Sequence, residues 1–321
     1  MRRAYALIAI PLLAALAVAG CSSSTPTKSS SAATANASVT ATGDFGKTPK
    51  VTIPSEKAGS NLVTKTLIKG SGATVTSSDS FMGEYVAYIW DGTKHSLLTT
   101  TYNATPALFP SSLLTGLQAA VKNATVGSRV LAVIPPKYGY GSQGYSQNGV
   151  KPTTTLVFVI DILKIYAGNQ AASGTSVSSG GHGLPTVSLA TSGTAPQVTI
   201  PKNKPPTALV SKTLIKGTGK PVAAGQSLVV QYTGVIWRTG KVFDSSWGRG
   251  YPFGFTIGAS PAQVISGWED GLLHQTVGSR VLLVIPPKDG YGSTGSSQAG
   301  IKGTDTLVFV VDILGAFGGA S

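Results

Sequence analysis

The chain of 321 residues contains two long copies of one sequence, and this duplication limits its fold more than any other feature. Lys65-Thr-Leu-Ile-Lys-Gly returns as Lys212-Thr-Leu-Ile-Lys-Gly. Later in the copies, Thr155-Leu-Val-Phe-Val returns as Thr306-Leu-Val-Phe-Val, at an offset four residues larger. The second copy therefore carries four extra residues in its middle. Two copies of this length predict tandem domains, because a solenoid needs several short repeats.

Within each copy the hydrophobic pattern predicts several β-strands and one short helix. The expected strands of the second copy are rich in β-branched residues and bounded by Gly or Pro, over residues 228–235, 281–285 and 306–314. Residues 261–274 place Ile265, Trp268 and Leu272 on one face of a helix. Long strands with one short helix form an α+β fold, so we expect two domains, each an antiparallel sheet wrapped around a short α-helix.

The N-terminus has the pattern of a signal peptide that ends at the only cysteine of the chain. Met1-Arg-Arg precedes an apolar run over residues 4–18, shorter than the ~20 residues that cross a bilayer. Cys21 follows Ala-Gly directly, which resembles the bacterial lipobox, whose cysteine is acylated and becomes the mature N-terminus. We expect residues 1–20 to be a lipoprotein signal peptide, and Cys21 to carry diacylglyceryl and palmitate chains. An uncleaved anchor helix with an incidental thiol remains the alternative.

Two segments of low complexity separate the N-terminus from the first copy and the first copy from the second. Residues 21–50 are rich in Ser, Thr and Ala, and residues 167–197 in Gly and Ser. Such segments have few large apolar residues to bury, so we expect a flexible stalk and a flexible linker. The predicted domains are then residues 51–166 and residues 198–321.

Composition excludes several classes of protein. The formal net charge of +13 favours anionic partners, but the Lys and Arg residues are scattered singly, so we expect no nucleic-acid binding. One cysteine excludes an intramolecular disulfide. His95, His182 and His274 are far apart in sequence, which predicts no metal site. Stability must therefore come from the apolar cores.

The second copy carries an ordered set of aromatic and turn motifs. They are Tyr232-Thr-Gly, Phe243-Asp-Ser-Ser, Pro252-Phe-Gly-Phe, Val264-Ile-Ser-Gly-Trp-Glu, Gly290-Tyr-Gly and Leu307-Val-Phe. In this order and spacing they resemble the FKBP-type peptidyl-prolyl cis-trans isomerases. The resemblance covers residues 209–315 closely and residues 62–166 in weakened form. It implies an isomerase (rotamase) that acts on X–Pro bonds without a metal or cofactor.

The resemblance implies a dry apolar pocket that binds the proline ring. Amide resonance sets a barrier of ~18–20 kcal/mol to X–Pro rotation. The twisted transition state is less polar than the ground state, so an apolar pocket favours it. Catalysis is assigned to Tyr232, Phe243, Asp244, Ile265, Trp268 and Tyr291. Substrate binding is assigned to Arg249, Phe253, Val264, Ile301 and Phe309.

The same resemblance gives individual roles to these residues. Trp268 would be the floor of the pocket. The backbone N–H of Ile265 and the hydroxyl of Tyr291 would donate hydrogen bonds to substrate. Asp244 would lie at the pocket edge, support Tyr232 and be kept ionised by Arg249. The other aromatic and aliphatic residues of the set would form the walls, with Ile301 on a loop over the pocket.

The first copy lacks part of this set. Ser96-Leu-Leu-Thr-Thr matches Phe-Asp-Ser-Ser in either of two registers, and both lose the acid. Leu117 stands where Trp268 stands in the second copy, and Leu113 and Leu114 replace Val-Ile. We therefore expect residues 51–166 to be a degenerate domain with little or no catalysis, used for binding or spacing.

These observations together predict a membrane-anchored, extracytoplasmic prolyl isomerase that helps exported proteins fold. Its partners would be proline-containing client polypeptides, the lipid bilayer through Cys21, and macrolide inhibitors. The alternative is a non-catalytic chaperone or scaffold whose two domains hold peptides. An isomerisation assay separates the two hypotheses.

Overall fold

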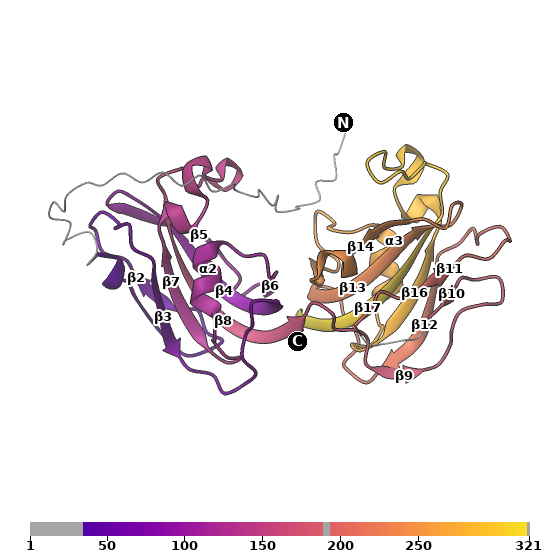
Figure 1. Cartoon of the computed structure of the whole chain (residues 1–321), viewed down its shortest axis with the longest axis horizontal. Helices are drawn as coiled ribbons and strands as arrows, with labels where there is room; N and C mark the ends of the chain where they lie inside the picture. Colours follow the sequence, from indigo (N-terminus) through magenta and orange to yellow (C-terminus); the bar gives the residue numbers. More distant parts are fainter. Residues whose placement is uncertain (1–34, 189–192, 320–321) are drawn as a thin grey trace, which may run out of the picture.

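The computed structural model describes residues 35–188 and 193–319. Figure 1 shows two β-rich domains side by side, each with a twisted sheet and a short helix, which confirms the α+β class. The expected signal peptide, Cys21 and residues 22–34 of the expected stalk lie outside the described residues. In the described ranges, no helix is both long and apolar enough to cross a bilayer.

The first domain is an antiparallel sheet packed on a short helix. Within the described residues it has six strands, in the order β3-β7-β8-β4-β5, with β6 paired to β4. They are β3 (Val63–Ile68), β4 (Asp79–Asp91), β5 (Lys94–Thr100), β6 (Ala107–Phe109), β7 (Arg129–Ile134) and β8 (Thr155–Ala167). Helix α2 (Thr115–Val121) buries Leu117 and Val121 in the core beneath the sheet. A helix of seven residues is unstable alone, so this burial maintains it.

The second domain repeats this arrangement. In the described part of the chain its sheet has seven strands, in the order β14-β13-β17-β16-β12-β9, with β15 paired to β13. They are β9 (Gly174–Ser176), β12 (Val210–Gly217), β13 (Gln226–Ile236), β14 (Val242–Ser245), β15 (Phe253–Thr256), β16 (Arg280–Ile285) and β17 (Leu307–Gly318). The order β14-β13-β17-β16-β12 corresponds to β5-β4-β8-β7-β3, so the sequence repeat is a structural repeat.

The helix of the second domain, α3 (Ser266–Leu272), is shorter than the predicted range of 261–274. Ile265, just before it, has an extended backbone with φ −66° and ψ 149°. His274, just after it, adopts a left-handed φ of 67°, a conformation that commonly follows the end of a helix. The apolar periodicity predicted too long a helix because Ile265, which lies outside the helix, packs against the same core as the helical residues.

The prediction of a flexible stalk over residues 21–50 is wrong for residues 35–50. Strand β1 (Thr40–Thr42) pairs with β2 (Lys50–Thr52). Ala35 and Val39 are fully buried beside Trp90, in a second apolar cluster of the first domain. The residues of β7 and β8 in this cluster alternate with those that face α2, so the segment covers the opposite face of the sheet. A few small apolar residues are enough to attach this segment to the sheet, and the overall composition of the segment did not indicate that they would be buried.

The prediction of a flexible linker over residues 167–197 is wrong for its described parts. Strand β9 joins the second sheet beside β12, and β10 (Thr186–Val187) pairs with β11 (Val198–Thr199). Val187 is buried in a cluster with Trp237 on the face of the second sheet away from α3. This segment therefore covers its sheet as the N-terminal segment covers the first, while residues 189–192 lie outside the described ranges.

A buried ion pair helps to fix each covering segment. Arg280 Nε donates to Asp312 Oδ1 at 2.6 Å, and the two side chains are 0% and 1% exposed. The covering segment supplies further partners, because Ser188 O accepts from Arg280 at 3.1 Å and the Ala172 N–H donates to Asp312 at 2.9 Å. The first domain has the equivalent pair, Arg129–Asp161, with contacts to Gly43, Gly46 and Lys47. In both domains these hydrogen bonds and ion pairs replace the water that the buried charges would otherwise bind.

The two domains contact each other through equivalent positions of the two copies. The shared cluster consists of Met82, Tyr166, Val229 and Leu314, with Leu108, Leu163 and Phe317 packed against it. By the repeat offsets, Met82 corresponds to Val229, Leu163 to Leu314 and Tyr166 to Phe317. The interface therefore uses the same surface on both domains, as in an isologous dimer.

Two glycines of the second domain allow this close approach. A Cβ at Gly315 would lie 2.1 Å from the Tyr166 hydroxyl oxygen, and a Cβ at Gly254 would lie 2.8 Å from the Cβ of Leu108. The first copy has Lys164 at the position equivalent to Gly315, and Leu108 itself is the equivalent of Gly254. The two copies have thus diverged into complementary shapes at their contact.

Candidate functional site

An aromatic cluster in the second domain surrounds Trp268, which α3 holds under the sheet. We define the Trp268 cluster as Tyr232, Phe243, Phe253, Phe255, Trp268 and Phe309. The Trp268 ring lies 5.1 Å from Tyr232, 5.2 Å from Phe309 and 5.6 Å from Phe255, centroid to centroid. All three contacts are edge-to-face, the arrangement that aromatic quadrupoles prefer. Trp268 is 4% exposed, so its indole is held in the core of the domain by these neighbouring rings.

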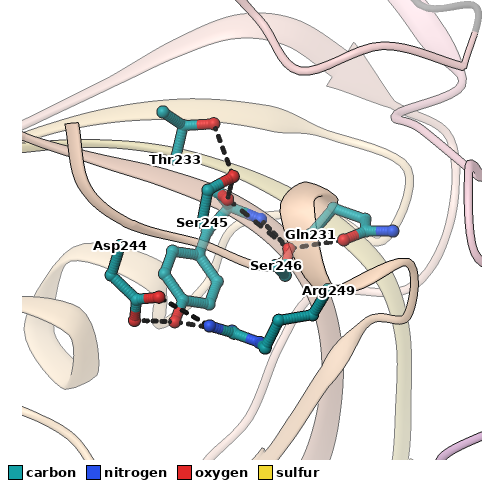
Figure 2. Close-up of polar contacts among 7 residues, drawn as sticks. Gln231, Thr233, Asp244, Ser245, Ser246 and Arg249 are labelled. Atoms are coloured by element: carbon teal, nitrogen blue, oxygen red, sulfur yellow. Dashed lines mark hydrogen bonds and ion pairs between the residues drawn. The ribbon is translucent and has the colours of Figure 1, made fainter.

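A polar group formed by three side chains borders this cluster. The hydroxyl of Tyr232 donates to Asp244, and Arg249 donates to Asp244 at 2.5 Å. Arg249 also donates to the Tyr232 hydroxyl at 2.9 Å, and its guanidinium lies 5.4 Å from the Tyr232 ring centroid. Figure 2 shows Asp244 and Arg249 pointing toward one another from the strand and the loop that follows it. The predicted contacts of Asp244 with Tyr232 and Arg249 are therefore present.

A β-bulge directs two consecutive side chains toward the cluster. Strand β14 pairs with β13 so that Asp244 is opposite Gly234 and Val242 is opposite Val235, with a register shift between them. Phe243 lies 5.5 Å from Phe309, while Asp244 reaches Tyr232, so both side chains serve the site. Bulges re-aim side chains in this way next to functional sites.

Gly234 makes room for the rings that meet beneath the bulge. A Cβ at this position would lie 2.8 Å from Phe243 Cζ and 2.9 Å from Phe309 Cε1. Any larger residue would push the two rings apart. The Gly in Tyr232-Thr-Gly is therefore required by packing at the site.

The environment keeps the site tyrosines protonated. Burial, reinforced by the hydrogen bond to Asp244, raises the pKa of Tyr232 far above its usual value. Burial and the negative charge of Asp244 raise the pKa of Tyr291. Burial alone would lower the pKa of Arg249, but its contacts with Tyr232 and Asp244 outweigh burial and raise it. Both tyrosines can therefore donate hydrogen bonds across the physiological pH range.

Several donors at the site have no partner in the described part of the chain. The N–H of Ile265, at the start of α3, makes no hydrogen bond there, and neither does the hydroxyl of Tyr291. The indole N–H of Trp268 is buried and also without a protein partner. Tyr291 is 36% exposed, which places its hydroxyl within reach of a ligand. The N–H of Ile265 and the hydroxyl of Tyr291 are therefore free to bind carbonyl oxygens of a peptide.

The structure gathers the predicted site residues in one region. Phe243, Phe253, Val264 and Ile265 are half-buried against the core that contains Trp268, Tyr232, Phe309 and Ile301. Sequence reasoning missed Phe255, which the alternation of Phe253-Gly-Phe255 places on the same face as Phe253. It also missed Gln231 and Ser246, which are fully buried and hydrogen-bonded to one another. The catalytic roles remain predictions.

In the first domain the structure shows which register applies. Thr99 is opposite Ala87, as Asp244 is opposite Gly234, so a threonine replaces the acid. Burial raises the pKa of Tyr85, the equivalent of Tyr232, and an interaction with the side chain of Thr99 lowers it in part. Leu117, 5% exposed, takes the place of Trp268. The first domain thus retains Tyr85, Phe109 and Phe158 of the aromatic set but lacks the charged pair and the indole base.

Neither domain presents a metal site in the residues described. No group of three or more His, Cys, Asp or Glu side chains gathers in residues 35–188 and 193–319.

Comparison with known proteins gives the family. A family model described as FKBP-type peptidyl-prolyl cis-trans isomerase matches residues 72–163 and 218–314, more than half of the chain. The chain therefore belongs to this family, and both copies are domains of it. It is a peptidyl-prolyl cis-trans isomerase, as the ordered motifs predicted.

Individual relatives match a length close to that of one domain. The FK506-binding protein of Streptomyces anulatus is 42% identical over 119 residues, which cover 37% of this chain and 94% of that protein. The probable FK506-binding protein of Corynebacterium glutamicum is 38% identical over 121 residues, covering 38% and 98%. Among solved structures, FkpA from Escherichia coli is 36% identical, with 36% of this chain and 51% of that chain covered and a TM-score of 0.32.

Proposed function

We propose that X–Pro isomerisation takes place at the Trp268 cluster of the second domain. The observation that carries this proposal is the group Tyr232–Asp244–Arg249 at the border of an aromatic surface, which only the second domain has among the described residues. A proline ring would lie on Trp268, between the rings of Tyr232 and Phe309. Free donors at Ile265 and Tyr291 would orient the substrate backbone.

The proposed mechanism is desolvation of the amide. In water, the planar X–Pro amide is stabilised by resonance and solvation, and its rotation faces a barrier of ~18–20 kcal/mol. Against apolar rings the planar form loses solvation, whereas the twisted, less polar form loses less. The ion pair of Asp244 with Arg249 holds the Tyr232 hydroxyl in place, so that the ring keeps its position as a wall.

The Trp268 cluster also indicates which ligands the second domain would bind. The relatives from Streptomyces anulatus and Corynebacterium glutamicum are named as FK506-binding proteins. We infer that a macrolide of this kind competes with proline-containing peptides for the Trp268 cluster. The alternative function, a non-catalytic peptide-holding chaperone, uses the same surface and differs only in giving no acceleration of isomerisation.

A matched pair of substitutions tests where catalysis takes place. Asp244→Leu leaves Arg249 and Tyr232 without their acceptor, and bonds to charged groups contribute ~1.5–3 kcal/mol. We expect kcat/KM for an X–Pro peptide to fall about 10- to 100-fold. Thr99→Leu, at the equivalent position of the first domain, should leave kcat/KM unchanged. Equal losses in the two variants would contradict a second-domain site.

We further propose that the chain is a lipoprotein that assists the folding of exported proteins on the extracytoplasmic side of the membrane. Support comes from the apolar N-terminal run that ends at Ala-Gly-Cys21. Two acyl chains on this cysteine would give stable attachment. Expression of the full chain and of Cys21→Ala, followed by detergent phase partitioning, tests this. We expect the wild type in the detergent phase and the variant in the aqueous phase; an aqueous wild type would refute anchoring.

A further inference from the structure

The end of the first domain touches the loop that carries Arg249. Gly168 follows directly on β8, and a Cβ at this glycine would lie 1.9 Å from the carbonyl oxygen of Gly250. Gly250 is the residue after Arg249, at the end of the short 3₁₀ helix η4 (Trp247–Arg249). A backbone contact this close leaves no space for any side chain, so the position of Gly168 limits where the Arg249 loop can lie.

A buried hydrogen-bond chain runs from the same glycine to the site. Gln231 Nε2 donates to the carbonyl oxygen of Gly168 at 2.7 Å. The other end of this amide, Oε1, accepts from the hydroxyl of Ser246. Ser246 Oγ in turn accepts from the backbone N–H of Tyr232 at 2.8 Å. Figure 2 shows the side chains of Gln231 and Ser246 joined beside the strand that carries Asp244.

Gly168 therefore holds both ends of the Arg249 loop, which runs from Ser246 to Gly250. Ser246, at the start of the loop, is linked to Gly168 through Gln231, and Gly250, at the end, packs on Gly168 directly. Gln231 and Ser246 are both 0% exposed, so water does not compete for these bonds. Arg249 and Asp244 are thus positioned relative to the first domain as well as to their own.

Gly168 is itself fixed by the contact between the domains. Tyr166, two residues earlier, is fully buried in the shared cluster, 6.5 Å from the ring of Phe317 and nearly perpendicular to it. A hydrogen-bond contact between Thr105 and Thr256, 3.5 Å long, also joins the domains. A change in how the domains meet would therefore move Gly168 and, with it, the loop.

Comparison with the first domain shows which of these hydrogen bonds occur only in the second domain. Thr101, the equivalent of Ser246, also accepts from the backbone N–H of its tyrosine, Tyr85, at 2.8 Å. Glu84 stands in place of Gln231, and no equivalent link to an interdomain residue exists in the described part of the first domain. The serine contact is thus common to both copies, whereas the amide link to the other domain belongs to the second.

We propose that Gln231 is a positioning residue through which the first domain, by way of Gly168, holds Tyr232, Asp244 and Arg249 in their active arrangement. The proposal rests on the proposed function, because it assigns catalysis to that arrangement. It gives the degenerate first domain a role in catalysis that needs no bound peptide. The partner that completes the second-domain site is then the first domain of the same chain.

The test is made on the full-length chain with a peptide isomerisation assay. Gly168→Ala adds one methyl group against Gly250, and Gln231→Met removes both amide bonds with little change in length. Since small misplacements of catalytic groups are costly, we expect each variant to lower kcat/KM about tenfold. Gly248→Ala is the control, because a Cβ at Gly248, in the same loop, would meet no atom within 4 Å.

A double-mutant cycle separates positioning from general destabilisation. If Gly168 and Gln231 act through Arg249, Gly168→Ala and Gln231→Met should cause no further loss in an Arg249→Leu chain. Losses that add to that of Arg249→Leu would overturn the proposal, as would wild-type activity in both single variants. If Gly168→Ala does not fold, Gln231→Met decides alone. The proposed function is judged separately, by the activity of the wild type and by the Asp244→Leu, Thr99→Leu and Trp268→Leu variants.

Discussion

Replacing Arg280 with methionine is expected to destabilise the second domain by about 3–5 kcal/mol, because it leaves Asp312 buried without its counter-charge. Arg280 makes two hydrogen bonds with this carboxylate, at 2.6 and 2.7 Å, and neither side chain is more than 1% exposed. The substitution also frees the carbonyl of Ser188, so the part of the covering segment around Ser188 should loosen. Urea unfolding monitored by Trp fluorescence measures the change.

Two further variants show that the unpaired charge is the cause. Arg280→Met with Asp312→Leu should recover most of the lost stability, because buried ion pairs can often be replaced by packed apolar residues. Arg238→Met should cost less than Arg280→Met, since Arg238 is 46% exposed and Asp305 keeps the hydrogen bond from the backbone N–H of Lys302. An Arg280→Met chain as stable as Arg238→Met would contradict the structural role of the buried pair.

Replacing Trp268 with leucine is expected to lower kcat/KM for an X–Pro peptide about 100-fold. The indole makes edge-to-face contacts with Tyr232, Phe255 and Phe309, and such contacts contribute ~0.5–1.5 kcal/mol each beyond area burial. Loss of the base on which the proline ring lies, with relaxation of these walls, removes about 3 kcal/mol of transition-state stabilisation, which corresponds to about 100-fold in rate.

The first domain provides the reason to expect that this variant folds. Leu117 occupies the same position on α2, buried in a core with the same topology. We therefore expect Trp268→Leu to unfold at a somewhat lower urea concentration but with the same m-value. A folded Trp268→Leu chain with wild-type kcat/KM would show that the cluster is not the site.

The sequence predicted the parts of the molecule that local patterns encode. The repeat predicted two domains of one topology, and the family resemblance that the ordered motifs carry implied that Tyr232, Asp244 and Trp268 lie together. The register around Thr99 stayed open because Ser96-Leu-Leu-Thr-Thr has no residue that fixes its pairing. Only the position opposite Ala87 in the sheet resolved it.

The parts that sequence reasoning missed depend on contacts between distant segments. Residues 35–50 and 167–188 resembled flexible tethers because Ala35, Val39 and Val187 are few among polar neighbours, yet each fills a place on a sheet face. The sequence did not predict the interdomain contact for a different reason. Strand β13 is buried on both faces, and the face of Val229 also carries Gln231 and Thr233, so nothing marked Val229 as facing the other domain.

We propose that this chain catalyses X–Pro isomerisation at the Trp268 cluster. The most direct test is exchange NMR of a proline-containing peptide with the full-length chain and with its Trp268→Leu variant. With the wild type we expect cis–trans exchange much faster than in buffer, and with the variant about 100-fold weaker acceleration. Exchange at the buffer rate with the wild type, or equal acceleration by both chains, would contradict it.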